Sequence, residues 1–441
     1  MTPDFSPRKA AFYTLGCKLN FAETSTIGKI LADRGFRRAL PEEAPDICVV
    51  NTCSVTEMAD KKGRSLIRRL SRRWPQATLV VTGCYAQLKP DEVAAIPGVD
   101  IVLGSNEKLR ISEYLDRWES DHAPIREATR PADITEFRPS CERGDRTRYW
   151  LKVQDGCDYY CTYCTIPFAR GRSRSGRIDL LVEQARVAAA AGGREIVITG
   201  VNIGEFGKDT GESLLDLLKA LDAVEGIERY RISSIEPNLL TEEIIDWVAH
   251  ESRAFMPHFH IPLQSGSDAV LKLMNRRYDT ALFASRIAAV RRMIPDAFIG
   301  VDVIAGARGE TPEEWQRTLD FISELDVTRL HVFPYSERPG TAALMMKAQA
   351  VEPAERHIRA ARLQIISDAK LLRYFQSMIG QERPVLWEHI VHDTDRMSGL
   401  TDNYLRVEAP ARPELINTVS RVEITGIDPE HEETLTARHL L

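Results

Sequence analysis

The first 115 residues repeat one pattern three times, in which an apolar strand ends in a loop that carries a cysteine and a helix follows. The strands are predicted at 11–15, 47–50 and 79–82, with helices from about residues 21, 56 and 90, and the loop cysteines are Cys17, Cys53 and Cys84. Continuous apolar strands that alternate with helices are typical of parallel sheets, whose ligand-binding loops meet at the carboxyl edge. We therefore predict an α/β domain over residues 8–120 that brings the three cysteines together.

The alternation of strand and helix returns between residues 148 and 372, after a segment at 121–147 that is rich in charge and proline and is interpreted as a linker. Six strands are predicted, at 149–153, 195–199, 229–233, 258–262, 298–303 and 329–333. Six successive β/α units indicate a partial (β/α)6 barrel with its site at the carboxyl ends of the strands. Residues 375–441 contain short alternating segments, which favour a small β-barrel.

Composition excludes several classes of protein. Eight cysteines among 441 residues are too few for a disulfide scaffold. The first ten residues are polar, and no apolar run approaches the roughly 18 residues of a membrane span. We therefore expect a cytoplasmic protein without a membrane partner, in which thiols stay reduced. The cysteines then need a role other than disulfide formation.

A second group of cysteines lies in the loop after the first barrel strand. Cys157, Cys161 and Cys164 are spaced as Cys-x3-Cys-x2-Cys. Clustered thiolates favour zinc or an iron–sulfur cluster. A structural zinc site usually has a fourth cysteine or histidine, and no histidine lies between Cys141 and His250. Three ligands leave one iron of a [4Fe–4S] cluster open.

Of the two remaining cysteines, Cys48 is predicted in a buried strand and Cys141 is interpreted as an ordinary thiol.

The loop over residues 154–164, QDGCDYYCTYC, resembles the signature of the radical S-adenosylmethionine (SAM) superfamily. That resemblance implies that the open iron binds the amino and carboxyl groups of SAM. It also implies that one electron cleaves SAM to a 5′-deoxyadenosyl radical. Tyr163, just before the third cysteine, is then expected beside the adenine.

The run PFARGRSRS over residues 167–175 resembles the methylthiotransferase branch of this superfamily. In that branch Cys17, Cys53 and Cys84 match the ligands of a second, auxiliary [4Fe–4S] cluster, and the C-terminal segment resembles a TRAM domain. The resemblance implies replacement of a C–H bond by C–S–CH3, with SAM as both methyl donor and radical source. It also implies an electron-donor protein and a sulfur source.

Polar residues and glycines at the carboxyl ends of the barrel strands are the candidates for further SAM contacts. They are Gly200, Asn202, Ser233, Glu236 and Gln264, with Glu236 and Gln264 as the preferred pair. Ordinary turn chemistry is the alternative for each. His258 and His260 alternate along one strand, and at least one of them is expected to be structural.

Two segments favour one substrate within the resembled branch. The run TLGCKLNFAET at 14–24 and the run HVFPYSERPGT at 331–341 look most like enzymes acting on N6-threonylcarbamoyladenosine at position 37 of tRNA, where C2–H of the adenine becomes C2–S–CH3. The branch that acts on prenylated adenosine usually has YGCQMN instead. Prenylated adenosine and an aspartate of a ribosomal protein remain the alternative substrates. A non-catalytic, metal-binding RNA-binding protein is the alternative from another class.

The distribution of charge along the chain indicates where the expected tRNA partner could bind. The chain has a net charge of −6, but the predicted helix near residues 56–73 carries a basic run without an acid: Lys61, Lys62, Arg64, Arg68, Arg69, Arg72 and Arg73. Such a run can contact phosphates, or can be a solvated face. The segment from Gln376 onward instead has 12 acidic and 6 basic side chains, which is unusual for an RNA-binding domain.

Overall fold

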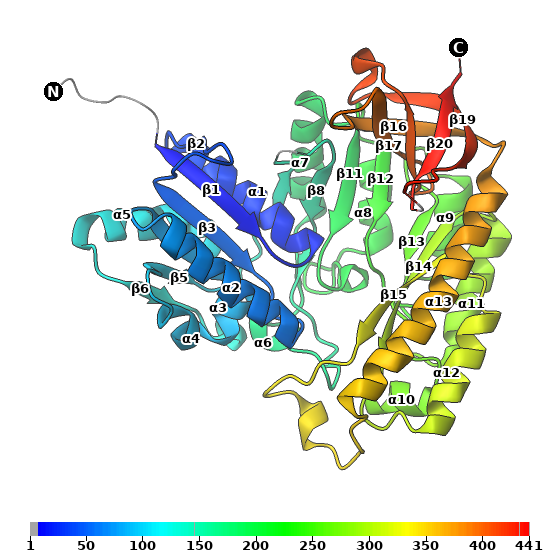
Figure 1. Cartoon of the computed structure of the whole chain (residues 1–441), viewed down its shortest axis with the longest axis horizontal. Helices are drawn as coiled ribbons and strands as arrows, with labels where there is room; N and C mark the ends of the chain where they lie inside the picture. Colours follow the sequence, from blue (N-terminus) through cyan, green and yellow to red (C-terminus); the bar gives the residue numbers. More distant parts are fainter. Residues whose placement is uncertain (1–7, 145, 432, 441) are drawn as a thin grey trace.

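The computed structural model describes residues 8–144, 146–431 and 433–440. An N-terminal sheet domain faces an open barrel, and a small closed barrel sits at one end of the open one (Figure 1). The α/β class with a C-terminal β-barrel is as predicted. None of the described helices is both long and apolar enough to cross a membrane.

The N-terminal domain is a parallel sheet in the order β2-β1-β3-β4-β5-β6, with an apolar core on each face. Its strands are β1 (Lys9–Thr14), β2 (Arg37–Arg38), β3 (Ile47–Thr52), β4 (Thr78–Gly83), β5 (Ile101–Leu103) and β6 (Ile125–Glu127). Its helices are α1 (Lys18–Asp33), α2 (Glu57–Arg73), α3 (Cys84–Leu88), α4 (Pro90–Ala94) and α5 (Ile111–Asp121). Cys48 is buried within β3, as expected.

The observed helices differ from the sequence expectation in two places. The first was expected from about residue 21 but begins at Lys18, directly after Cys17. The helix expected from about Pro90 is α4, which begins at Pro90, but an unpredicted short helix, α3, precedes it and begins at Cys84 itself. The second helix starts where expected because Thr56 caps it, its hydroxyl accepting from the backbone N–H of Ala59 at 3.1 Å. The cysteine loops are therefore short, and two of the cysteines lie at helix amino ends.

Residues 121–147 contribute to both neighbouring sheets. β6 pairs with β5 in the N-terminal sheet, and β7 (Ser140–Glu142) pairs antiparallel with the first barrel strand. Cys141 is buried in β7. This segment therefore ties the two domains together through backbone hydrogen bonds as well as through the chain.

The open barrel consists of two sheets, β7-β8-β11-β12 and β13-β14-β15, joined by single bridges from Tyr230 to Phe255 and from Ser234 to His260. Its parallel strands are β8 (Tyr149–Lys152), β11 (Glu195–Thr199), β12 (Arg229–Ile232), β13 (His258–His260), β14 (Phe298–Ala305) and β15 (Arg329–Pro334). A short pair, β9 (Gln154–Asp155) and β10 (Arg174–Ser175), follows β8. Each of the six predicted strands overlaps an observed one.

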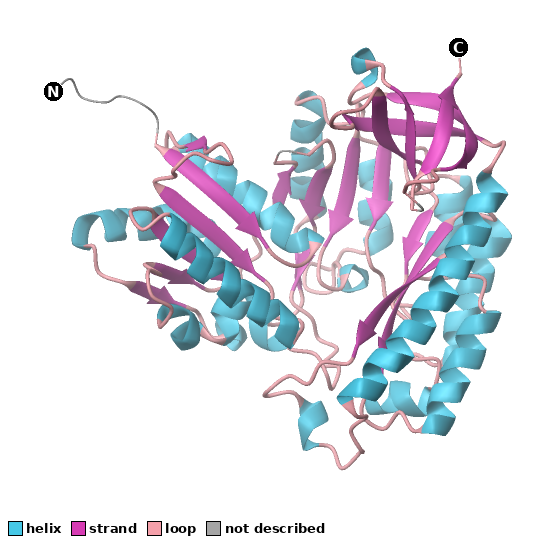
Figure 2. Cartoon of the chain, viewed as in Figure 1, coloured by secondary structure: helices cyan, strands magenta, loops and turns pink. Residues whose placement is uncertain are grey.

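Helices cover the outside of the barrel and leave its strands facing the N-terminal domain (Figure 2). The short α6 (Ile166–Arg170) is not among them and lies against α3 of the N-terminal domain. The covering helices are α7 (Ile178–Ala190), α8 (Leu214–Asp222), α9 (Glu242–His250), α10 (Asp268–Leu273), α11 (Thr280–Met293), α12 (Pro312–Glu324) and α13 (Pro353–Met378). The largest apolar core lies between these helices and the strands.

The C-terminal domain is a closed barrel in the order β16-β17-β18-β20-β19. Its strands are β16 (Glu382–Ile390), β17 (Arg396–Thr401), β18 (Arg406–Pro410), β19 (Val419–Ile427) and β20 (Leu435–His439). It packs at the amino ends of the open barrel's strands. Arg229, the first residue of β12, donates to the carbonyl of Leu400 at 2.9 Å, and Phe298, the first of β14, joins its core.

Candidate active site

The three N-terminal cysteines lie at the carboxyl ends of neighbouring strands. A Cβ atom added at Gly16, whose φ is +103°, would lie 2.6 Å from the Cβ and 2.9 Å from the Sγ of Cys53, so the Cys17 and Cys53 loops touch. Cys53 and Cys84 are buried and Cys17 is exposed. Burial, reinforced by the neighbouring Cys84 and Cys17 thiols, raises the pKa of Cys53 to about 12.

The barrel cysteines are presented by a tight loop after β9. The backbone N–H of Tyr159 donates to the Sγ of Cys157 at 3.5 Å, and that of Ile166 donates to the Sγ of Cys164 at 3.4 Å. Burial raises the pKa of both thiols to about 12. Gly156 has a φ of +72°, and a side chain there would collide with the carbonyl of Arg172, so only glycine fits this turn.

The chemistry of the two donor sets fits iron–sulfur clusters, which are held by cysteine thiolates. Each set consists of three free cysteines, and backbone N–H groups donate to two sulfurs of the barrel set. Hydrogen bonds to the sulfurs are among the features by which proteins tune such clusters.

Arg276 contacts the cysteine loop and was not among the residues predicted from the sequence. Its Nη1 donates to the Sγ of Cys161 at 3.1 Å and lies 3.4 Å from the hydroxyl of Tyr163, and its Nη2 forms an ion pair with Glu236. Burial raises the pKa of Glu236, although Arg276 acts in the opposite direction. Arg276 thus links Glu236, a predicted site residue, to Cys161 and Tyr163 of the cysteine loop. Nothing in the local sequence marks Arg276, which lies in a basic turn after α10.

The other predicted SAM contacts fall into two groups. Gly200 and Ser233 line a large cavity, whereas Asn202 and Gln264 do not. Asn202 is buried, and its side-chain amide has no hydrogen-bond partner among the described residues. Gln264 is buried in a left-handed backbone conformation with a φ of +68°.

Gln154, which was not predicted as a site residue, connects the Cys157 loop to the loop after β11. Its Oε1 accepts from the backbone N–H groups of Val201 at 3.0 Å and Asn202 at 2.9 Å. Its Nε2 donates to the carbonyl of Gly156 at 2.7 Å. One buried amide therefore fixes the relative position of the cysteine loop and the Gly200 turn.

The cavity, of about 1270 Å³, is enclosed by all three domains. Cys17 and Lys18 come from the N-terminal domain, Gly200 and Ser233 from the carboxyl ends of barrel strands, and Tyr404 from the closed barrel. Burial acts to raise the pKa of Tyr404, but the nearby Lys18 and Arg148 outweigh it and lower the pKa. The exposed Cys17 thus opens onto the same space as the barrel's strand ends.

Two histidines in this cavity have different surroundings. His258 is buried, stacks on Tyr404 with ring centroids 4.2 Å apart, and has its pKa held well below the usual value by burial. His260 is partly exposed, and its Nε2 lies 2.8 Å from the Oδ1 of Asp302. His258 is therefore the structural member of the pair, while His260 presents a polar group to the cavity.

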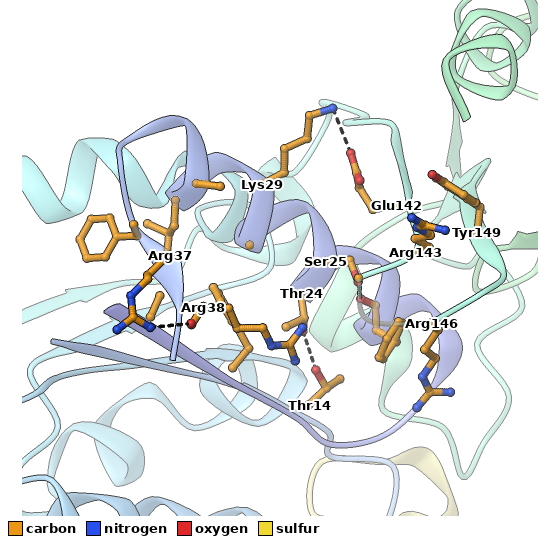
Figure 3. A pocket seen from close by; sticks show the side chains of 18 residues that line it. Thr14, Thr24, Ser25, Lys29, Arg37, Arg38, Glu142, Arg143, Arg146 and Tyr149 are labelled. Carbon is orange, nitrogen blue, oxygen red and sulfur yellow. Dashed lines mark hydrogen bonds and ion pairs between the residues drawn. The ribbon is translucent and has the colours of Figure 1, made fainter. Parts of the chain in front are cut away.

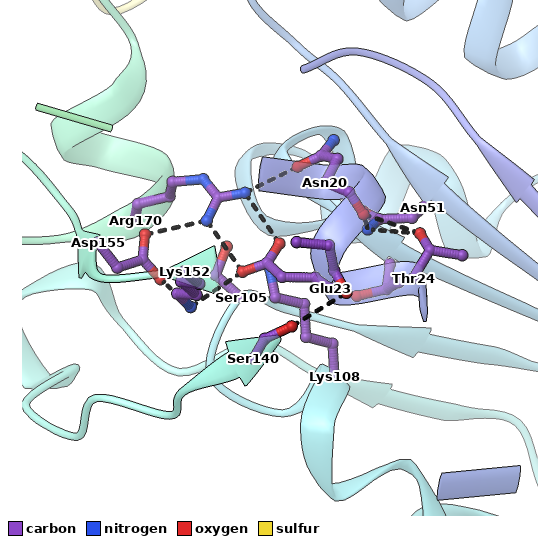
Figure 4. Close-up of polar contacts among 12 residues, drawn as sticks. Asn20, Glu23, Thr24, Asn51, Ser105, Lys108, Ser140, Lys152, Asp155 and Arg170 are labelled. Carbon is purple, nitrogen blue, oxygen red and sulfur yellow. Dashed lines mark hydrogen bonds and ion pairs between the residues drawn. The ribbon is translucent and has the colours of Figure 1, made fainter. Parts of the chain in front are cut away.

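A buried ion network joins the N-terminal domain to the barrel (Figure 4). Glu23 of α1 pairs with Lys108 at 2.5 Å, Lys152 at 3.1 Å and Arg170 at 3.1 Å, and Asp155 pairs with Arg170 at 2.9 Å. Arg174 pairs with Asp155 as well, at 3.0 Å. Four cations thus surround two carboxylates. Burial raises the pKa of Cys84, and the charges of Arg170 and Lys108 act in the opposite direction.

The network was not predicted from the sequence. One signal was available, because Glu23 falls on the same helical stripe as Leu19 and Ile27, which are buried apolar residues. A carboxylate on that stripe needs a buried partner. The partners themselves lie up to 147 residues away along the chain.

A second cavity, of about 590 Å³, lies between β1, α1 and residues 142–149 (Figure 3). None of the predicted site residues lines it. Its cations already have partners: Lys29 pairs with Glu142 at 3.1 Å, and the guanidinium of Arg146 stacks on Phe21 at 4.3 Å. It is therefore a groove between domains, separate from the cysteine sets.

Comparison with known proteins assigns the two large domains. The Radical SAM superfamily model matches residues 151–322, and the model of the uncharacterized protein family UPF0004 matches residues 9–104. A radical SAM methyltransferase structure, TsrM from Kitasatospora setae, superimposes with a TM-score of 0.57 at 16% identity, covering 76% of this chain and 77% of that one. The fold and the cysteine loop thus define a radical SAM protein.

Curated relatives narrow this class. The threonylcarbamoyladenosine tRNA methylthiotransferase MtaB of Bacillus subtilis is 39% identical over 421 residues, 94% of this chain and 93% of that protein. MtaB of Thermotoga maritima is 38% identical, covering 90% of each chain. A tRNA-2-methylthio-N(6)-dimethylallyladenosine synthase of Desulfitobacterium hafniense is 31% identical, covering 95% of each. The chain belongs to the radical SAM methylthiotransferase family.

Proposed function

We propose that this protein methylthiolates N6-threonylcarbamoyladenosine at position 37 of tRNA in the cytoplasm, converting C2–H of the adenine to C2–S–CH3. One observation carries the proposal: Cys17 opens into the same cavity as Gly200 and Ser233, at the carboxyl ends of barrel strands. Both MtaB relatives are named for this activity. Their sequence identity to this chain, 39% and 38%, is higher than the 31% of the dimethylallyladenosine synthase.

We assign a SAM-binding cluster to Cys157, Cys161 and Cys164 and an auxiliary cluster to Cys17, Cys53 and Cys84. When bound, these groups supply the one-electron cleavage of SAM and the sulfur that is transferred. The chain's own contribution is positioning, because the two ligand sets and the substrate carbon must meet in one place. Gln154 holds the Cys157 loop against the Gly200 turn, and the network around Glu23 holds the N-terminal domain against the barrel.

The remaining site assignments are also proposals. We place SAM near Tyr163, Gly200, Asn202, Ser233 and Glu236, with Gln264 on the next strand end, and we keep the domain boundaries at 8–120, 148–372 and 375–441. The closed barrel and the walls of the cavity exclude water from the reacting atoms, which protects a reactive carbon centre from competing hydrogen donors. An electron-donor protein and a sulfur source complete the reaction.

Nucleoside mass spectrometry tests the substrate. In tRNA from cells that lack this gene, the threonylcarbamoyl nucleoside should carry no methylthio group, and restoring the gene should restore it. A methylthio group that appears instead on prenylated adenosine, or on a ribosomal-protein aspartate, would assign the alternative substrate. Binding of tRNA without any deoxyadenosine formation would assign a non-catalytic RNA-binding protein.

Iron content tests the two-cluster assignment. Protein reconstituted without oxygen should hold about eight irons, two [4Fe–4S] clusters. Cys157→Ala should leave about four irons and abolish SAM cleavage. Cys17→Ala should spare SAM cleavage and stop the methylthio product. Zinc in place of iron, or about four irons in the unmodified protein with Cys17, Cys53 and Cys84 open to alkylation, contradicts the assignment.

A further inference from the structure

Lys18 is a cation in the cavity that lacks an anionic partner. It follows Cys17 directly at the start of α1 and is half-buried. Its Nζ lies 5.7 Å from the ring centroid of Tyr404, and no described carboxylate lies within ion-pair distance of it. The ammonium is also close enough to His258 and His331 to contribute to lowering their pKa values. Lys18 and both histidines line the cavity.

Two of the other cations in the cavity wall are already paired with carboxylates. Arg148 donates to Glu388 at 2.9 Å, and Arg329 forms a two-point ion pair with Glu433. Arg406 is exposed and donates to the hydroxyl of Ser398 at 3.0 Å. A half-buried ammonium that is held by an aromatic ring alone is incompletely compensated, so Lys18 is the cation of this wall that is placed to bind an incoming anion.

The proposed substrate carries an anion in a suitable position. The threonylcarbamoyl group is attached to N6 of the adenine and ends in a free carboxylate. N6 and the reacting C2 flank N1 on the same edge of the base. One cysteine must lie near the reacting carbon, and another side chain must contact the N6 substituent. These two residues must therefore lie side by side in the site. Cys17 and Lys18 are consecutive residues, with Cα atoms about 3.8 Å apart.

We propose that Lys18 determines substrate specificity by binding the carboxylate of the threonylcarbamoyl group inside the cavity. This inference rests on the proposed function. The same ammonium disfavours a neutral apolar substituent at N6, because such a group would desolvate the charge without pairing it. Tyr404, from the closed barrel, forms the aromatic wall behind the ammonium, so the C-terminal domain takes part in substrate selection despite its acidic composition.

Binding measurements with the reconstituted holoenzyme test the role of Lys18 independently of turnover. Fluorescence anisotropy would compare two tRNA anticodon stem-loops, one with threonylcarbamoyladenosine at position 37 and one with unmodified adenosine. The intact protein should prefer the modified loop by roughly tenfold, as expected for a hydrogen bond to a charged group. Lys18→Gln should bind both loops with the affinity of the unmodified one, and Lys18→Arg should retain a preference. Lys29→Gln, on the same helix but outside the cavity, is the matched control.

Lys18→Gln could alter binding by perturbing the neighbouring Cys17 loop, so a second experiment keeps the protein intact and changes the ligand instead. The methyl ester of the threonylcarbamoyl loop keeps its shape and loses its charge, so the intact protein should bind it like the unmodified loop. Equal weakening of both loops by Lys18→Gln would indicate a phosphate contact and overturn the proposal, as would tight binding of the ester. Nucleoside analysis of cells with the unmodified gene separates the two possible failures. If these cells make the methylthio product but the binding results go against Lys18, only the role of Lys18 fails. If these cells do not make the product, the proposed function fails.

Discussion

Arg170 and Glu23 form a fully buried two-point ion pair across the boundary between the barrel and the N-terminal domain, with N–O distances of 3.2 and 3.1 Å. Arg170 lies in the helix that follows the Cys164 loop. It also lies beside Cys84, where its charge opposes the burial that raises the pKa of that thiol. Arg170 therefore links α6, the helix after the barrel cysteines, to Cys84 of the N-terminal cysteines.

Neutralising Glu23 should destabilise the assembly of the two domains. Glu23→Gln removes the carboxylate that pairs with Lys108 and leaves Lys152 paired with Asp155 alone, and breaking a buried ion pair typically costs about 3–5 kcal/mol. We expect a lower denaturation midpoint and faster proteolysis within residues 121–147. Glu42→Gln removes an exposed pair with Arg73 and should change stability by less than about 1 kcal/mol. Equal effects of the two variants would contradict a structural role for the network.

Replacing Arg276 should shift the potential of the proposed SAM-binding cluster. Arg276→Gln removes a positive charge and the hydrogen bond to the Sγ of Cys161, both of which stabilise a reduced cluster. The midpoint potential should therefore become more negative, as measured by redox titration with electron paramagnetic resonance. Arg292→Gln, on the outer surface of α11, should leave the potential unchanged. A potential that is also unchanged in Arg276→Gln would place the arginine outside the influence of the cluster.

His258 should make the protein less stable in mild acid. Burial lowers its pKa in the folded state, so below about pH 6.5 the unfolded chain binds a proton that the folded chain does not. The free energy of unfolding should then fall as the pH drops from 7 to 5, by up to about 1.4 kcal/mol per pH unit from this residue. His258→Gln should show a shallower dependence in matched thermal unfolding. An identical slope in both proteins would assign the acid sensitivity to other groups.

The basic face of α2 should contribute to tRNA affinity in a salt-dependent way. Arg68, Arg69 and Arg72 are exposed, and none of them forms an ion pair with a described residue, whereas Arg64 and Arg73 pair with Glu92 and Glu42. Replacing the three by glutamine should weaken tRNA binding and reduce the slope of log affinity against log salt by up to about 0.9 for each lost phosphate contact. Arg317→Gln on α12 should leave the slope unchanged. An unaltered slope in the triple variant would make α2 a solvated face.

The sequence alone predicted the strand-helix order, the domain order and the two cysteine sets. These features are encoded locally. Apolar runs determine which segments become buried strands, and the parallel arrangement places the loops after β1, β3 and β4 at one edge. The spacing of Cys157, Cys161 and Cys164 could be read from one short segment, although contacts from the distant residues Leu273 and Arg276 help to hold the loop. The short helix that begins at Cys84 was not predicted.

Only the tertiary structure revealed how the charged side chains are used. Lys18 and Tyr404 are 386 positions apart in the chain, and Glu23 meets Arg170 across two domains. A charged residue in a helix has the same local sequence signal whether it faces water or a buried partner. Its partner is decided by how the domains pack, and packing depends on contacts summed over the whole molecule. The positions and spacing of the cysteines were therefore readable from the sequence, while the cavity and the place of Lys18 within it emerged only from the fold.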